Sequence, residues 1–186
     1  MTWAIDASHS QATFSVRHMM VSTLRGHFNV LSGQLHIDEA HPENSWVEAE
    51  VDVASIDTRD EKRDGHLRSP DFFDAEKYPK IIFKSNKVEH VGGQDYKITG
   101  DLTMHGVTQP VTFEAEYAGQ ISKDPFGLQR AGLAAKATIN RKDFGLVWNV
   151  ALETGGVMVS EKVNIEIDLE AVQQAPTEQA AAAAQA

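Results

Sequence analysis

Hydrophobic and polar residues alternate with a period of two over long segments, and this alternation constrains the fold more than any other feature of the chain. In the first such segment, residues 12–20, Phe14 and Val16 alternate with Thr13 and Ser15. A period of two is typical of a β-strand with one face buried and the other in water. About eight segments of this kind occur along the chain. The others cover residues 26–37, 47–53, 81–83, 96–104, 111–117, 133–139 and 157–169.

Turn sequences separate several of these segments. Residues 92–95, 105–108 and 124–127 are rich in glycine and turn-forming polar residues. Connections of hairpin length join antiparallel neighbours. Within residues 26–37 the apolar positions change phase beside residues 32–33, where we expect a β-bulge or a sharp bend.

Residues 58–74 interrupt the alternation and predict one short helix. Thr58 and Glu61 fit a capping box, and Pro70 would end the helix. Three apolar residues are expected to hold this segment across the sheet: Leu67, Phe72 and Phe73.

The strands must cover their apolar faces and leave no open edges, and a closed barrel does both. A β-sandwich is the alternative. Strands of about 11 residues, rising about 3.3 Å per residue and tilted about 40°, would give a barrel about 28 Å tall. Eight strands enclose an interior that side chains fill or that holds one slim ligand. We therefore predict an all-β, extended eight-stranded antiparallel barrel over residues 1–172, with residues 173–186 as a low-complexity, disordered tail.

Charge and composition exclude several functions. The chain has 17 basic and 27 acidic residues, a net charge of −10, which repels nucleic-acid phosphates and anionic membrane surfaces. The absence of cysteine excludes thiol catalysis and cysteine-bound metals. No apolar run is long enough to cross a membrane, and the N-terminus lacks the pattern of a signal peptide. We therefore expect a cytoplasmic protein, or a periplasmic one if a signal peptide has been removed.

Metal and cofactor sites find little support. His18 shares the phase of Val16 and would face the interior, but no further ligands lie at metal-binding spacing. The acidic residues between 57 and 64 do not follow the alternation of a calcium loop. We expect no metal and no cofactor, and His18 would then lie in the barrel wall or meet the polar end of a ligand.

Catalytic candidates are equally sparse. No Gly-x-Ser-x-Gly motif occurs. Glu161 shares the phase of Val159 and Val163, so it would face the interior and need a partner. An enzyme would need an acid–base pair there, such as His18 with Glu161. We predict no catalytic residues.

The apolar run at residues 144–152 lies on a connection between strands. It follows a polar stretch at residues 140–143 and precedes the glycine pair at 155–156. Apolar side chains on a connection are costly unless they are buried. The run would plug one end of the barrel, form a dimer contact, or act as a hydrophobic gate over a ligand entrance.

Four blocks of the sequence resemble the YceI-like family of lipid- and polyisoprenoid-binding proteins. They are WAIDASHSQATFSVRHMMVSTLRGHF (residues 3–28), SPDFFDAEKYPKIIF (69–83), GDLTMHGVTQPVTFEAEY (100–117) and DPFGLQRAGLAAKATINRKDFGLVWN (124–149). The resemblance runs in order from Trp3 to Leu169. It implies a lipocalin-like barrel with a short helix, a homodimer, and an elongated cavity for an isoprenoid or another long-chain amphiphile. Family members with a signal peptide are periplasmic, and this sequence departs from them.

We predict a non-enzymatic binding or carrier protein for a polyisoprenoid, an isoprenoid quinone or a similar lipid with a small polar head. Two alternatives remain open: an enzyme acting on a lipidic substrate, and an interaction protein with a filled barrel. The polar head is expected near His18, Arg17 or Arg141, although strand phase turns Arg17 outward unless it lies at the rim. The predicted ligand contacts are Phe14, Val16, His18, Met20, Phe28, Val51, Val53, Phe83, Ile98, Leu102, Met104, Phe113, Tyr117, Ile139, Arg141, Phe144, Trp148 and Val163.

Overall fold

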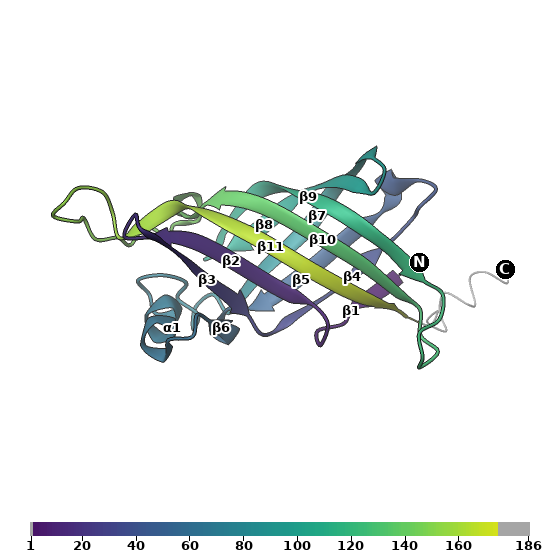
Figure 1. The fold of residues 1–186 in the computed structure, drawn as a ribbon, viewed down its shortest axis with the longest axis horizontal. Coiled ribbons are helices and arrows are strands. Elements are labelled where there is room, and N and C mark those ends of the chain that lie inside the picture. Colours follow the sequence, from purple (N-terminus) through teal and green to yellow (C-terminus); the bar gives the residue numbers. More distant parts are fainter. Residues whose placement is uncertain (1, 175–186) are drawn as a thin grey trace.

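A computed structural model describes residues 2–174, which form a closed antiparallel β-barrel of eight wall strands with one α-helix, as predicted (Figure 1). Six wall strands are continuous and pair in sequence order. These are β5 (Trp46–Asp52), β7 (Lys80–Gly92), β8 (Asp95–Met104), β9 (Val107–Ile121), β10 (Arg130–Asn140) and β11 (Val159–Gln173). Each of the other two is built from two pieces: β1 (Thr2–Ile5) with β2 (Gln11–His18), and β3 (Ser22–Phe28) with β4 (Leu31–His36).

The long strand β11 closes the barrel because it pairs with both pieces of the first wall strand. β2 lies along its first part, with Phe14 opposite Ile165, and β1 lies along its end, with Trp3 opposite Gln173. β4 then pairs with both β1 and β5, which completes the ring.

One part of the wall is not formed by a long strand. The second edge of β3 pairs only with the two-residue strand β6 (Ile56–Asp57), which lies beside the 3-10 helix η2 (Val53–Ser55). The helix α1 (Glu61–Arg68) follows directly, and Figure 1 shows α1 and β6 beside β3, near one end of the barrel. The helix and the turn after it therefore cover this part of the wall.

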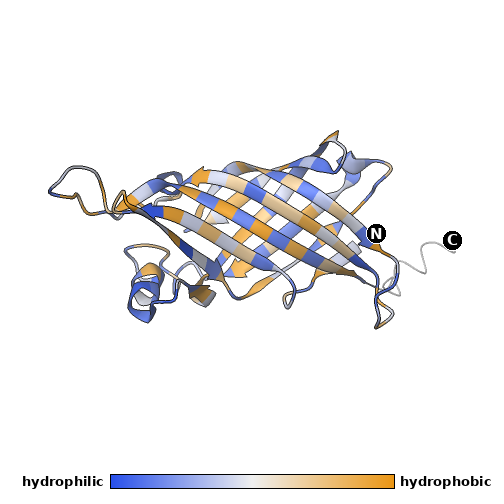
Figure 2. Cartoon of the chain, viewed as in Figure 1, coloured by the Kyte–Doolittle hydropathy of each residue, from blue (hydrophilic) through white to orange (hydrophobic). Residues whose placement is uncertain are grey.

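Side chains alternate across the wall as the sequence pattern predicts. Figure 2 shows hydrophobic and hydrophilic residues alternating along β2, β10 and β11. The buried residues include Leu102, Phe113 and Leu169. On the outer face, Lys84 lies 3.5 Å from Glu48 across β5 and β7. The wall thus separates an apolar interior from a charged exterior.

The change of phase of the apolar positions in residues 26–37 does not come from the bulge or bend expected at residues 32–33. The strand breaks at residues 29–30 instead, so β3 and β4 are separate pieces, and Val30 is 48% exposed. Gly33 instead allows β4 to approach β5 closely, because a Cβ there would lie 2.2 Å from the carbonyl oxygen of Glu48. The break, rather than a bulge, resets the alternation.

The predicted helix is present, but the capping box is wrong. Asp60 caps α1, because its carboxylate accepts a hydrogen bond from the backbone N–H of Arg63. Thr58 instead donates to the buried carboxylate of Asp64 through its backbone N–H and its hydroxyl. Glu61 pairs with Arg68 at 3.1 Å. Within residues 2–174, no helix has the length and apolar character needed to cross a membrane.

The C-terminal boundary lies close to the edge of the described residues. Gln173 ends β11 and Gln174 follows it, whereas the rest of the tail predicted at residues 173–186 lies outside the described residues.

Arg130 joins three carboxylates at one end of the barrel. Its guanidinium donates to Asp6 and Glu170 through Nη1, and to Asp124 through Nε at 2.6 Å. One side-chain atom each of Asp6, His9 and Glu170 lies within 4.8 Å of the others, and both carboxylates already pair with the Arg130 guanidinium. The cluster links the N-terminal turn, the 124–127 turn and β11.

Hydrogen bonds hold two of these carboxyl groups in the charged form. The pKa of Asp6 is lowered from its ordinary value by bonds from Ser8, His9 and Arg130. The pKa of Asp124 is lowered by Arg130 and by backbone N–H groups. A carboxyl group whose pKa is lower in the folded chain stabilises the fold above its unfolded pKa and loses that effect as the pH falls.

Acidification should therefore destabilise the protein, and more strongly in the wild type than in Arg130→Met. The ordinary carboxyl pKa is 3.8, so the loss should begin near that pH and grow as the pH falls through the lowered folded values. Urea unfolding at pH 7 and at about pH 3 measures this loss of stability. Arg130→Met should show the shallower pH dependence, and equal dependence in the two proteins would contradict the assignment.

A second prediction concerns the close approach of β7 and β8 at Gly100. A Cβ there would lie 2.3 Å from the carbonyl oxygen of Lys84, so Gly100→Ala must shift backbone and should cost about 1–3 kcal/mol in urea unfolding. Gly65→Ala is the matched control, since Gly65 is exposed on α1 with no neighbour within 4 Å of its Cβ position. It should stabilise the protein by about 0.5–1 kcal/mol. Effects of the same sign at both positions would contradict the packing described.

Candidate ligand-binding cavity

The barrel encloses an apolar cavity of about 210 Å³. Its lining comes from side chains of the strands, from Leu67, Phe72 and Phe73 of α1 and the following turn, and from Arg141 and Leu146 of the connection between β10 and β11. Only three of the described lining residues are polar: Thr13, Glu50 and Arg141. The Thr13 hydroxyl donates to the carbonyl of Glu166, and the Glu50 carboxylate lies 3.2 Å from Lys80. The surface of the cavity is therefore apolar.

Most of the residues predicted to contact a ligand line this cavity. They share the inward phase of their strands, apart from Arg141, which follows β10. They are Phe14, Val16, Phe28, Val51, Phe83, Ile98, Leu102, Met104, Phe113, Ile139, Arg141 and Val163.

Four other predicted contacts lie elsewhere. His18 ends β2 opposite Val159 and does not line the cavity. Met20 is 59% exposed in the turn after β2, with a φ of 65°, because the strand ends before it and the alternation stops there. Val53 is buried in η2 rather than on a strand, outside the lining. Tyr117 lines a second, smaller pocket.

The remaining two belong to the connection between β10 and β11. Phe144 ends the 3-10 helix η3 (Arg141–Phe144) and is fully buried, but it does not line the cavity. The Trp148 ring packs on the rings of Phe72, 5.1 Å away, and His66, 4.9 Å away. The apolar run at 144–152 is thus a strand connection, as predicted, and it packs against the helical segment; its role as a gate stays a prediction.

Several lining residues were missed by the sequence analysis. The apolar ones on strands face inward with the same alternation as the predicted contacts, so the alternation could have identified them. Phe72 and Phe73 had been assigned only to packing. The missed strand residues of this phase are Ala12, Leu31, Val47, Ala49, Ile81, Leu133, Ala135, Val159, Ile165, Ile167 and Leu169. Leu146, on the connection after β10, was also missed.

Arg141 anchors the connection to the end of the barrel. Its side chain is buried and donates to four backbone carbonyls: Ser160, Leu146, Trp148 and Val159. Burial lowers the pKa of Arg141, and the charge of Glu161 opposes this effect in part. By contrast, Arg17 donates to the Thr23 hydroxyl and the Met20 carbonyl and does not line the cavity.

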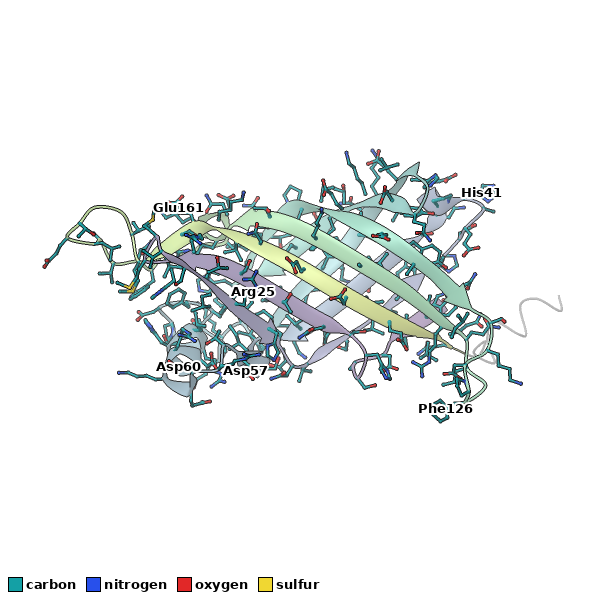
Figure 3. The ribbon with its side chains drawn as sticks, viewed as in Figure 1. Arg25, His41, Asp57, Asp60, Phe126 and Glu161 are labelled. Atoms are coloured by element: carbon teal, nitrogen blue, oxygen red, sulfur yellow. The ribbon has the colours of Figure 1, made fainter. Side chains whose placement is uncertain are left out.

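The acid–base pair that an enzyme would need does not form, because Glu161 faces outward (Figure 3). The register between β11 and β2 shifts between Val159 and Val163, and this irregularity moves Glu161 off the inward phase. Its carboxylate lies 2.6 Å from Lys142, and this bond lowers the pKa of Glu161.

A second pocket of about 70 Å³ shares several of the same interior residues and extends toward the opposite end. There the Tyr117 hydroxyl and the Gln120 amide both donate to the carboxylate of Glu39. Burial and this carboxylate raise the pKa of Tyr117. Asp38 also lines the pocket, so this end of the barrel is acidic.

Comparison with known proteins agrees with this architecture. The family model of the YceI-like domain matches residues 3–171. Protein YceI of Escherichia coli is 40% identical over 169 residues, which cover 91% of this chain and 84% of that protein. The crystal structure of Burkholderia cenocepacia BcnA superposes with a TM-score of 0.77 at 25% identity, covering 89% of this chain and 98% of BcnA.

A domain from Saccharophagus degradans, described as polyisoprenoid binding, superposes with a TM-score of 0.67. The match covers 92% of this chain and 98% of that domain at 18% identity. At this identity the likeness shows the fold alone.

The packing of Phe72 between the cavity and Trp148 can be tested by truncation. Phe72 is 7% exposed, so Phe72→Ala should lower the free energy of unfolding by about 3–5 kcal/mol. Phe126, labelled in Figure 3, is 85% exposed. Phe126→Ala should therefore change the free energy of unfolding by less than about 0.5 kcal/mol. Urea unfolding followed by circular dichroism measures both, and similar losses would contradict the placement of Phe72.

Proposed function

We propose that this chain, which belongs to the YceI-like family, is a non-enzymatic binding protein that holds a long apolar chain inside its barrel. The observation that supports this proposal is the cavity of about 210 Å³, which side chains of the described residues do not fill. The surface of its lining is aliphatic and aromatic.

The energetics favour an apolar occupant. Apolar side chains that line an unfilled volume lack packing partners on that side, so the cavity leaves packing free energy unrealised. A hydrocarbon chain would recover part of this, and each buried methylene adds about 0.8 kcal/mol. A polar solute would instead lose hydrogen bonds to water without gaining partners.

The shape favours a slim chain. The main cavity and the smaller pocket share Val47, Ile98, Leu133 and Leu169, so they follow one another inside the barrel. We propose a polyisoprenoid, an isoprenoid quinone or a similar lipid as the ligand, carried with its tail inside. The described domain of the same fold from Saccharophagus degradans suggests isoprenoids as the first class to test.

The proposal extends to assembly and location. We propose a homodimer, for which the exposed side chains of Met20, Val147 and Val150 at one end of the barrel offer apolar surface. We also propose a cytoplasmic location. Neither alternative function gains an observation: the His18–Glu161 pair is not formed, and a filled barrel is inconsistent with the cavity.

Affinity should increase with chain length in a series of neutral isoprenoid alcohols. From geraniol to farnesol to geranylgeraniol, each added isoprene unit should tighten binding by roughly tenfold or more, because five more carbons are buried. Native mass spectrometry of the purified protein measures one-to-one complexes, after extraction of any lipid that copurifies. Equal affinities across the series, or no complex with any alcohol, would contradict the proposal.

Two neighbouring alanines provide a matched pair of variants for the same measurement. Ala135 lines the cavity, whereas Ala134 on the same strand is exposed on the outer face. Ala135→Phe should weaken geranylgeraniol binding at least about tenfold by occupying the bore, and Ala134→Phe should leave it unchanged. Full affinity in Ala135→Phe would place the chain outside the barrel.

A further inference from the structure

Exposed apolar side chains gather on two neighbouring turns at one end of the barrel. One turn, residues 19–21, joins β2 to β3, and the other is the connection of residues 145–158 between η3 and β11. The backbone N–H of Met19 donates to the carbonyl of Met158 at 2.7 Å, so the two turns lie side by side. Their exposed apolar residues, which we call the apolar tip, are Met19, Met20, Val21, Val147 and Val150.

The apolar tip projects into solvent. Val21 is 78% exposed and Val147 is 62% exposed. Figure 1 shows the connection before β11 extending beyond the ends of the neighbouring strands. Exposed apolar side chains that lie together, rather than singly, mark a surface that contacts a partner.

The segments that form the apolar tip continue from the wall of the main cavity. Val16 lines the cavity shortly before the first turn, and Leu146 lines it within the connection. Val159 lines it where the connection ends and β11 begins. The apolar tip therefore lies at the end of the barrel where the main cavity adjoins the two turns.

The charge of this end differs from that of the whole chain. The exposed charged residues of the two turns and their flanks, residues 17–22 and 142–162, are Arg17, Lys142, Lys162, Asp143, Glu153 and Glu161. Three are basic and three are acidic, so they balance, whereas the chain as a whole has a net charge of −10. A balanced surface is not repelled by a lipid surface, whereas an acidic one is repelled by anionic lipids.

The opposite end also exposes apolar side chains, but without these two features. Phe126 and Leu128 are exposed there, and Figure 3 shows Phe126 at the other end of the barrel from Glu161. They flank the Arg130 cluster, in which one guanidinium meets three carboxylates, and neither residue lines the main cavity. Cavity and charge, rather than exposure alone, therefore distinguish the end that carries the apolar tip.

A lipid bilayer fits the apolar tip better than a folded protein partner does. A protein partner must match the shape of both turns over a substantial area. A bilayer needs no such match, because its interface takes up separate apolar side chains at shallow depth. The balanced charge around the tip suits zwitterionic lipid.

We infer that the apolar tip docks the protein on a zwitterionic lipid bilayer, with the side chains of Val21 and Val147 inserted into its interface. Docking turns the cavity end toward the lipid. The inference rests on the proposed function in one respect, since a bilayer is the phase in which a long apolar chain is dissolved. The proposed homodimer uses Met20, Val147 and Val150, so a docked protomer cannot keep that contact.

Cosedimentation with phosphatidylcholine vesicles, using protein from which lipid has been extracted, tests docking. The wild type should sediment with the vesicles, and the double variant Val21→Asp/Val147→Asp should bind them at least tenfold more weakly. Val91→Asp/Phe126→Asp is the matched control, because it makes the same charge change at two exposed apolar residues outside the tip. It should bind like the wild type. No binding by the wild type, or equal binding by the two double variants, would overturn the inference.

Two further measurements separate docking from the other proposals. Native mass spectrometry with geranylgeraniol should give the same affinity for Val21→Asp/Val147→Asp as for the wild type, since neither valine lines the cavity. Alcohol binding without vesicle binding would overturn docking alone, and vesicle binding without alcohol binding would overturn the proposed function. Sedimentation velocity gives the oligomeric state, and a dimer that is lost in Val21→Asp/Val147→Asp, with no vesicle binding by the wild type, would assign the tip to a second copy of the chain.

Discussion

The pairing of β11 with both β1 and β2 is the interaction on which the rest of the structure depends. A sheet with one apolar face is stable only if that face is covered, and here the 15 residues of β11 join the first wall strand to the last. The interruption between β1 and β2 does not open the ring, since each piece keeps its own part of β11 as a partner. Closure converts eight half-buried faces into one interior surface. The cavity follows from this, because eight strands enclose more width than their inward side chains fill near α1.

Two arginines close the two ends in different ways. Arg130 is surrounded by the carboxylates of Asp6, Asp124 and Glu170, so its charge is neutralised and the cluster acts as a structural link. Arg141 binds four backbone carbonyls, and these bonds hold the connection between β10 and β11 against the end of the barrel. The same residue type therefore stabilises both ends of the fold. The carboxylate of Glu39 lies beside the smaller pocket, at the end opposite Arg141.

Strand phase predicted the interior well and failed where the backbone departs from regular pairing. Phe14 and Phe113 were placed correctly, because a period of two decides which face a side chain occupies. Glu161 was placed on the wrong face, since no residue pattern revealed the register shift between β11 and β2. The interior position predicted for Met20 was wrong because β2 ends at His18, and the positive φ of Met20 in the following turn was not visible in the sequence.

The candidate site needed tertiary contacts that alternation does not describe. The contributions of Phe72 and Phe73 depend on how the segment after α1 covers the wall beside β3, which no local pattern specifies. The position of Arg141 near the cavity was predicted, but its bonds to four backbone carbonyls became evident only when the connection was placed around it. Local periodicity thus predicted the walls, and the chemistry of the site required the fold.

Whether an apolar chain lies inside the barrel or on its surface can be measured by nuclear Overhauser contacts between a bound isoprenoid chain and assigned methyl groups of the protein. A chain inside the barrel should give contacts to inward methyls such as those of Leu102 and Ile139, and none to the exposed methyls of Val91 and Val147. Contacts confined to the exposed methyls, with no change at the inward ones, would contradict it.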